Sequence, residues 1–170
     1  MVVVVKKADA EDVKILSKKL LLLLEDKQSQ IYIDNVVKFG IPDEYVKKAF
    51  AEETLQKAIT KGNSAIYIAF ENGKIIGFAQ TIKQAADTAE LDRIIIFPAY
   101  TRKGIGTQLL NHVISDLKEN GVSALVVYTG KNETQARRFY EKNGFELIKE
   151  ATVDTPWGVK LDIVTYKLCL

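Results

Sequence analysis

The fold is decided by the stretch IIIFPAYTRKGIGT, which occupies residues 94–107. Its first part is a run of three isoleucines that ends at Pro98, which is typical of a strand buried on both faces. Its second part carries two basic residues and a Gly-x-Gly, Gly104 to Gly106, at the start of a long amphipathic pattern. The stretch therefore predicts a buried strand, a basic loop and a helix in direct succession.

The helix predicted after Gly104 offers an anion site at its first turn. A helix N-terminus carries unpaired N–H groups and the positive end of the helix dipole. Glycine lets the backbone approach a ligand closely, and Arg102 and Lys103 add positive charge. These features together form a cradle for a pyrophosphate. The third glycine of the dinucleotide fingerprint and the Gly-Lys-Ser/Thr of a Walker loop are both missing, so Gly-x-Gly alone also fits an ordinary helix start.

Strands and helices alternate on both sides of this stretch. We predict strands at residues 2–5, 64–71, 74–82, 90–97, 124–128, 145–148 and 161–168, with a tight hairpin turn at Asn72-Gly73. We predict helices from Asp9 through the leucine run, over residues 45–61, over residues 105–117 and over residues 135–143, with residues 25–40 irregular. The order β-α-α-β-β-β-α-β-α-β-β indicates one α/β domain, residues 1–170, with a mixed sheet. Its strands 90–97 and 124–128 should run parallel, because a helix connects them.

The composition is that of one soluble globular domain. Of the 170 residues, 47% are apolar and 27% charged, and the 24 Lys and Arg are spread along the chain, which argues against nucleic-acid binding. The N-terminal apolar run precedes its charges and is too short for a signal peptide. The longest pure apolar run, Leu20 to Leu24, is far shorter than a membrane span. Cys169 is the only cysteine, so no internal disulfide is possible. We expect a cytoplasmic protein that binds neither membranes nor nucleic acids.

Two stretches resemble the cofactor motifs of one enzyme family. Residues 94–107 resemble motif A of the GNAT acetyltransferases, which reads Arg/Gln-x-x-Gly-x-Gly/Ala after a strand ending in x-Pro. Residues 132–145, NETQARRFYEKNGF, resemble the second motif of that family, Asn-x-x-Ala-x-x-Phe-Tyr-x-x-x-Gly-Phe. Thr101 departs from the first motif by standing where Arg or Gln is usual. Asn132 departs from the second by lying eight residues before Tyr140, where seven is usual.

The resemblance implies the GNAT fold, a twisted, mixed and mostly antiparallel sheet of about seven strands with flanking helices. It also implies acetyl-CoA as cosubstrate, bound where the strand 90–97 splays from the strand 124–129. The strand backbone would pair with pantetheine and polarise the thioester carbonyl. The residues that the resemblance assigns to acetyl-CoA are Ile94, Ile95, Ile96, Arg102, Lys103, Gly104, Ile105, Gly106, Thr107 and Asn132.

The same resemblance assigns the proton transfers. Tyr140 would protonate the departing CoA thiolate, because a phenol stays protonated at neutral pH. Glu90 would take the proton from the incoming amine, with Asp92 on the same side of the strand as the substitute. The amine attacks directly in this family, so Cys169 need not be a nucleophile. His112, the only histidine, falls on the polar side of its helix, and no residue spacing suggests a metal site.

The acceptor amine is left open by the sequence. We expect the acceptor region to be built from residues 25–59 and the link 84–88. Residues 45–55 resemble polyamine acetyltransferases of the PaiA type, and the carboxylates of Asp87, Glu90 and Asp92 would suit a polycation. The alternatives are a protein N-terminal α-amine, a GNAT module that binds acyl-CoA without catalysis, and a nucleotide-binding regulator. A homodimer also stays open.

Overall fold

Seven strands form one sheet in the computed structural model, which describes residues 2–170. The spatial order is β1-β2-β3-β4-β5-β7-β6, and every neighbouring pair is antiparallel except β4 and β5, which are parallel. The strands are β1 (Val3–Lys7), β2 (Ser64–Glu71), β3 (Lys74–Lys83), β4 (Thr88–Ile96), β5 (Ala124–Gly130), β6 (Glu146–Asp154) and β7 (Lys160–Cys169). The predicted mixed, mostly antiparallel sheet is therefore confirmed.

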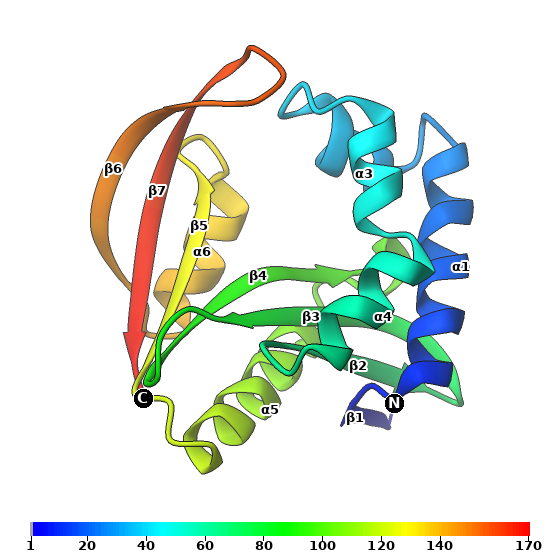
Figure 1. The fold of residues 1–170 in the computed structure, drawn as a ribbon, viewed down its shortest axis with the longest axis horizontal. Coiled ribbons are helices and arrows are strands. Elements are labelled where there is room, and N and C mark those ends of the chain that lie inside the picture. Colours follow the sequence, from blue (N-terminus) through cyan, green and yellow to red (C-terminus); the bar gives the residue numbers. More distant parts are fainter. Residues whose placement is uncertain (1) are drawn as a thin grey trace.

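Helices cover both faces of this sheet. They are α1 (Ala10–Glu25), α2 (Gln30–Tyr32), the π-helix η1 (Ile33–Val37), α3 (Asp43–Ala49), α4 (Glu52–Thr60), the 3₁₀ turn η2 (Pro98–Tyr100), α5 (Ile105–Glu119) and α6 (Thr134–Lys142). In Figure 1, α1, α3 and α4 lie on one side of β2, β3 and β4, and α5 lies on the other. None of the helices between residues 2 and 170 is long and apolar enough to cross a membrane.

The two faces of the sheet bury two separate apolar clusters. The cluster under α5 and α6 contains Leu109, Leu110 and Val113 packed on Ile76 and Ala79 of β3, among others. The cluster under α1 and α4 joins apolar side chains of these helices to those of β2 and β3, including Val13, Leu16, Leu20, Leu55, Ile66, Ile68 and Phe78. The leucine run of α1 is therefore core, as the helical spacing predicts.

Two local signals in the sequence are confirmed at atomic detail. Asp9 caps α1 by accepting from Asp12 N at 2.9 Å, and Asp12 reaches back to Asp9 N at 3.1 Å, which is a capping box. Asn72 and Gly73 both have positive φ, 50° and 74°, as a type I′ hairpin turn requires.

The single helix expected over residues 45–61 is wrong. The chain instead forms α3 and α4, which are separated at Phe50 and Ala51. Phe50 is 2% exposed in the apolar cluster, and its carbonyl accepts a hydrogen bond from Ser17 Oγ of α1 at 2.7 Å. That bond satisfies a terminal carbonyl of α3, so a tertiary contact ends the helix where helical propensity alone would continue it.

Two other boundaries also differ from expectation. Residues 25–40, expected to be irregular, contain α2 and η1. The strand expected over residues 145–148 continues as β6 to Asp154, because it pairs with β7 as far as Lys160. The longer hairpin carries its turn across to the first helices, where Trp157 Nε1 donates to the carbonyl of Phe39 at 3.3 Å.

Candidate active site

The parallel strands β4 and β5 separate after three residue pairs. Thr88, Ala89 and Glu90 pair with residues 124–126 of β5, and beyond Glu90 the two strands share no ladder. From there β4 pairs with β3 alone, and β5 pairs with β7 alone. The opening expected between the strands 90–97 and 124–129 is thus present.

A β-bulge at Asp92 marks the point of separation. Gln80 of β3 pairs with Arg93 and Thr81 pairs with Leu91, so Asp92 is the extra residue of β4. A bulge bends its strand and increases the local twist. It therefore directs β4 away from β5 at this place.

Beyond the bulge, β4 presents a free backbone edge toward the opening. Phe97 N donates to the carbonyl of Ile76 in β3 at 2.9 Å. Because successive peptide groups of a strand point to opposite edges, Ile95 also bonds toward β3, while Ile94 and Ile96 direct their N–H and C=O groups to the other edge. These groups can pair with an extended ligand such as the pantetheine arm of acetyl-CoA.

Gly77 holds this end of β4 close to β3. A Cβ on Gly77 would lie 2.7 Å from Ile96 Cδ1 and 2.8 Å from the carbonyl oxygen of Ile95. Residue 77 must therefore be glycine if β4 is to keep its position beside the opening. The sequence offered no signal for this role beyond a glycine inside a strand pattern.

The loop after β4 leads into the N-terminus of α5, where the sequence predicts a phosphate cradle. Gly104 caps the helix with φ 76°, and Arg102 also has a positive φ, 61°. Lys103 Nζ lies 5.6 Å from the centre of the Tyr100 ring. The N–H groups at the start of α5, residues Ile105 to Thr107, lack a preceding helical turn to bond to. This loop and helix start suit a pyrophosphate.

Thr101 and Gly106 each have a structural role. Thr101 Oγ1 donates to the carbonyl of Pro98 at 3.0 Å, which closes the η2 turn. A Cβ on Gly106 would meet Phe139 Cε2 of α6 at 3.2 Å. Gly106 therefore allows α5 to approach α6 closely, a packing function that the motif reading, concerned with phosphate, did not include.

Replacing both Arg102 and Lys103 by alanine should weaken CoA binding more than binding of an analogue without phosphates. Both side chains are exposed at the start of α5, so their charge is available to phosphate but screened by salt. Calorimetry with both ligands at low and high salt measures the effect. The difference should shrink at high salt, and equal losses for both ligands would contradict the assignment.

Tyr140 is held in an aromatic cluster at the end of α6. It is 7% exposed, and its ring lies 5.5 Å from the rings of Phe139 and Phe145 and 6.1 Å from that of Tyr166. Burial raises the pKa of Tyr140 to about 12. The phenol therefore keeps its proton across the physiological range.

Hydrogen bonds to β7 fix α6 and so the position of Tyr140. Tyr166 donates through its hydroxyl to Glu141 Oε1 at 2.6 Å, and Arg137 Nε donates to that hydroxyl at 2.9 Å. Arg137 also donates to the carbonyl of Lys131 in the preceding turn at 2.9 Å. These contacts tie the middle and the C-terminal end of α6 to Tyr166 of β7.

Glu90 and Asp92 are near neighbours with different surroundings. Burial and the negative charge of Asp92 raise the pKa of Glu90, and a hydrogen bond from Gln84 Nε2 at 2.9 Å opposes the rise. Asp92 Oδ2 accepts a hydrogen bond from Arg93 Nε at 3.2 Å and forms an ion pair with Arg93 Nη2, also at 3.2 Å. Glu90 is thus a carboxylate of raised pKa, and Asp92 is already paired with Arg93.

Three other residues considered from the sequence make none of the contacts described for Tyr140, Glu90 and Asp92. Asn132 is an exposed residue of the turn between β5 and α6, where its carbonyl accepts from Thr134 N at 2.9 Å. His112 is exposed on α5, as predicted, with its ring 6.1 Å from that of Tyr67. Cys169 is exposed at the end of β7. Residues 2–170 contain no group of three or more His, Cys, Asp or Glu side chains placed to hold a metal ion.

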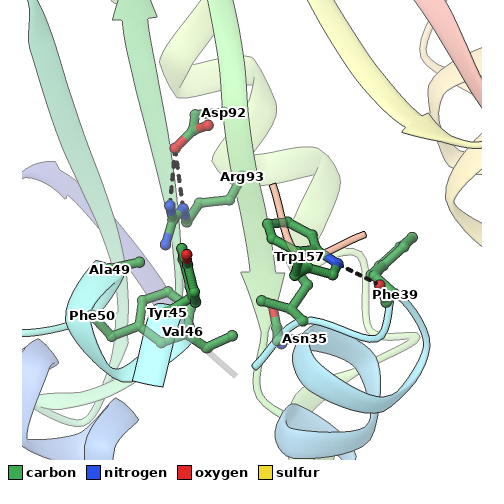
Figure 2. Close-up of a pocket in the computed structure, with 10 residues that line it drawn as sticks. Asn35, Phe39, Tyr45, Val46, Ala49, Phe50, Asp92, Arg93 and Trp157 are labelled. Carbon is green, nitrogen blue, oxygen red and sulfur yellow. Dashed lines mark hydrogen bonds and ion pairs between the residues drawn. The ribbon is translucent and has the colours of Figure 1, made fainter. Parts of the chain in front are cut away.

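A pocket of about 330 Å³ opens beside the bulge of β4 (Figure 2). Its walls come from η1 and the loop after it, from α3, from β4 and from the β6–β7 turn. The lining residues are Asn35, Phe39, Ile41, Tyr45, Val46, Ala49, Phe50, Asp92, Arg93 and Trp157. The first helices line it, as expected of the acceptor region, but the link 84–88 does not.

Trp157 is, with Arg93, one of the pocket residues that the sequence did not indicate. It is the only tryptophan of the chain, and the sequence marked its surroundings only as a Pro-Trp-Gly turn. Its Nε1 bonds to the carbonyl of Phe39, and its ring lies 5.8 Å from that of Tyr45. Lys38, next to Phe39, forms an ion pair with Glu133 at 3.2 Å. The first helices are therefore joined to the β5–β7 half of the sheet across the opening.

The chain is similar to acetyltransferases in both its sequence and its fold. The model of the acetyltransferase (GNAT) family matches residues 30–145. A spermidine N(1)-acetyltransferase of Thermoplasma acidophilum is 30% identical over 109 residues, 62% of this chain and 67% of that protein. The [ribosomal protein bS18]-alanine N-acetyltransferase of Escherichia coli is 33% identical over 110 residues, 63% of this chain and 72% of that protein. The crystal structure of the PaiA N-acetyltransferase of Thermoplasma acidophilum with coenzyme A superposes with a TM-score of 0.70 at 24% identity, covering 99% of this chain and 100% of the other.

Proposed function

The chain belongs to the GNAT acetyltransferase family, and from this premise we propose that it transfers acetyl from acetyl-CoA to a primary amine by direct attack in a ternary complex. The observation that carries the proposal is the free edge of β4, which lies between the cradle at α5 and the pocket at the bulge. A thioester held along that edge and an amine in the pocket would meet where β4 leaves β5. A thiol-release assay with acetyl-CoA and a panel of amines tests this.

Different residues would hold the pyrophosphate, the pantetheine arm and the thioester of acetyl-CoA. Arg102, Lys103 and the backbone from Gly104 to Thr107 would bind the pyrophosphate. The free N–H and C=O groups of Ile94 and Ile96 would pair with pantetheine, and an N–H of this edge would donate to the thioester oxygen as that oxygen gains negative charge. The bound thioester supplies an activated acyl group with a thiolate leaving group. Asn132 would contact pantetheine at the far side of the opening.

Acetyl transfer requires two proton transfers, one from the amine and one to the CoA thiolate. The N–C bond forms as the C–S bond breaks, so the amine must lose a proton and the thiolate must gain one. Glu90 would take the first, because its raised pKa makes it a better base than an ordinary glutamate. Tyr140 would give the second, since burial keeps it protonated. Asp92 is the weaker candidate for the base because Arg93 already binds its carboxylate.

The pH profile of kcat/KM should show an acidic limb and no alkaline limb caused by Tyr140. Glu90 acts as a base only when deprotonated, and its pKa is raised, so activity should fall as pH drops through that raised value. Tyr140 acts as an acid only when protonated, and a pKa of about 12 keeps it so throughout a pH 5–10 profile.

Two variants identify which carboxylate causes the acidic limb. Glu90→Gln should remove the limb together with most of the activity. Asp92→Asn should move it to lower pH, because loss of the neighbouring negative charge lowers the pKa of Glu90. An acidic limb that Glu90→Gln leaves in place would assign the base to another group.

The proposed acceptor is a small primary amine. Polyamines remain on the test panel because a relative acts on spermidine, and N-terminal peptides because another acts on a ribosomal protein alanine. The alternative to an enzyme is a GNAT module that binds acetyl-CoA without catalysing a reaction. Binding of acetyl-CoA with no thiol release for any amine of the panel would favour it.

A further inference from the structure

The pocket at the bulge carries a balanced pair of charges rather than an acidic surface. Asp92 and Arg93 are its only charged lining residues, and they bind each other. A polyamine bears several positive charges and needs several unpaired carboxylates. Here the one carboxylate of the lining is already paired with Arg93, and Glu90, which interacts with Asp92, is not itself a lining residue. The lining therefore does not favour a polycation.

Each member of the Asp92–Arg93 pair keeps a free hydrogen-bonding group. Both contacts from Arg93 go to the same oxygen, Asp92 Oδ2. Within residues 2–170, neither Asp92 Oδ1 nor Arg93 Nη1 has a hydrogen-bond partner. Oδ1 can accept from an amine and Nη1 can donate to a carboxylate, both at the same end of the pocket.

The Arg93 guanidinium is positioned before a ligand arrives. Its carbon Cζ lies 4.9 Å from the centre of the Phe50 ring, and Phe50 is fully buried. The ring on one side and Asp92 on the other fix its orientation, so little side-chain freedom is lost when it binds an anion. Its side chain remains 26% exposed, which leaves it accessible.

Apart from Asn35, the rest of the pocket is lined by apolar and aromatic residues. Phe39, Tyr45 and Trp157 form walls around the charged end, and Ile41, Val46 and Ala49 complete them. In Figure 2, Tyr45 and Phe50 come from the α3 side and Trp157 from the opposite side. About 330 Å³ between them is room for a small ligand with an apolar side chain.

We propose that the acceptor is an α-amino acid with a large apolar or aromatic side chain, its α-carboxylate bound by Arg93, its amine at Asp92 and its side chain among Phe39, Tyr45 and Trp157. This inference rests on the proposed acetyltransferase function and names its substrate class. Asp92 is two residues from Ile94, about 7 Å along the strand. An amine at Asp92 is thus within short reach of a thioester held at the Ile94 edge, with Glu90 nearby to take its proton.

The test compares phenylalanine, phenylalanine amide, phenethylamine, glycine, spermidine and an N-terminal peptide in the thiol-release assay. Phenylalanine should exceed its amide and phenethylamine in kcat/KM by roughly tenfold or more, because only phenylalanine offers Arg93 a carboxylate. It should also exceed glycine, because glycine leaves the aromatic walls unfilled. Equal rates for acid and amide would overturn the inference, as would spermidine or the peptide being the best substrate. Those outcomes still show transfer to an amine, whereas no thiol release from any amine contradicts the proposed function itself.

Variants tie the preference to the pocket. Arg93→Met keeps an apolar stem over Phe50 and should abolish the preference for acid over amide, because methionine offers the carboxylate no donor. Arg93→Lys, which retains the charge but not the fork, should keep part of the preference. Lys118→Met removes an exposed cation at the other end of α5 and is the matched control. Trp157→Ala should raise KM for phenylalanine more than for glycine. An unchanged preference in Arg93→Met would overturn the assignment.

Discussion

Tyr140→Phe is expected to lower kcat by about 10²-fold or more while CoA binding persists. The change keeps the ring and its contacts with Phe139, Phe145 and Tyr166 but deletes the hydroxyl proton. If the phenol protonates the leaving thiolate, the loss should fall on kcat. The proposed contacts to CoA come mostly from the backbone of β4 and α5, which the substitution does not touch. Single-turnover thiol release, in which chemistry limits the rate, is the measurement.

The leaving group provides the control for Tyr140. A thioester with a more acidic thiol needs less protonation as it departs, so the variant should lose less activity with it. The pKa of about 12 makes proton transfer to a thiolate unfavourable unless the transfer accompanies C–S cleavage, which strengthens this dependence. A Phe variant with unchanged kcat would leave water or another group as the acid.

Gly77→Ala is expected to lower the free energy of unfolding by about 3 kcal/mol and to weaken CoA binding at the same time. The new Cβ would lie 2.8 Å from the carbonyl oxygen of Ile95, which is backbone and cannot rotate away. Strand β4 must shift, and the shift falls on the segment whose free edge would hold pantetheine. Thermal unfolding should show a Tm lower by about 10 °C for a chain of this size.

Gly73→Ala is the matched control for Gly77. Gly73 lies in the β2–β3 hairpin turn with φ 74°, and a Cβ there would meet nothing within 4 Å. Its substitution should cost only the backbone strain of a left-handed residue, about 1 kcal/mol. CoA affinity should remain normal. If Gly77→Ala unfolds and binds CoA as the natural sequence does, β4 is not held by this contact.

The elements that the sequence predicts well are those with strong local signals. The Asp9–Asp12 capping box and the Asn72-Gly73 turn both lie where their residue types place them. Each depends on a few neighbouring residues, so sequence alone contains the relevant information. The break at Phe50 depends on Ser17 of another helix, and for that reason no local pattern indicates it.

The candidate site, like the fold, has parts that neighbouring residues indicate and parts that they do not. The cradle at Gly104 and the aromatic setting of Tyr140 follow from contiguous motifs. The pocket does not, because Phe39, Arg93 and Trp157 are brought together from distant parts of the chain. The bulge at Asp92 is also hidden, since residues 88–96 can be read as a regular strand until their register with β3 is known. The suggestion that Asp92 would suit a polycation counts its carboxylate as free, whereas in the structure Arg93 binds that carboxylate.

The thiol-release assay with acetyl-CoA and the full amine panel tests the central claim most directly. We expect at least one small primary amine to cause release of free thiol from acetyl-CoA in step with formation of the N-acetyl product. Phenylalanine should be the most active amine of the panel. Glu90→Gln and Tyr140→Phe should each reduce that release without abolishing CoA binding. Tight binding of acetyl-CoA by calorimetry together with no thiol release from any amine would contradict the account.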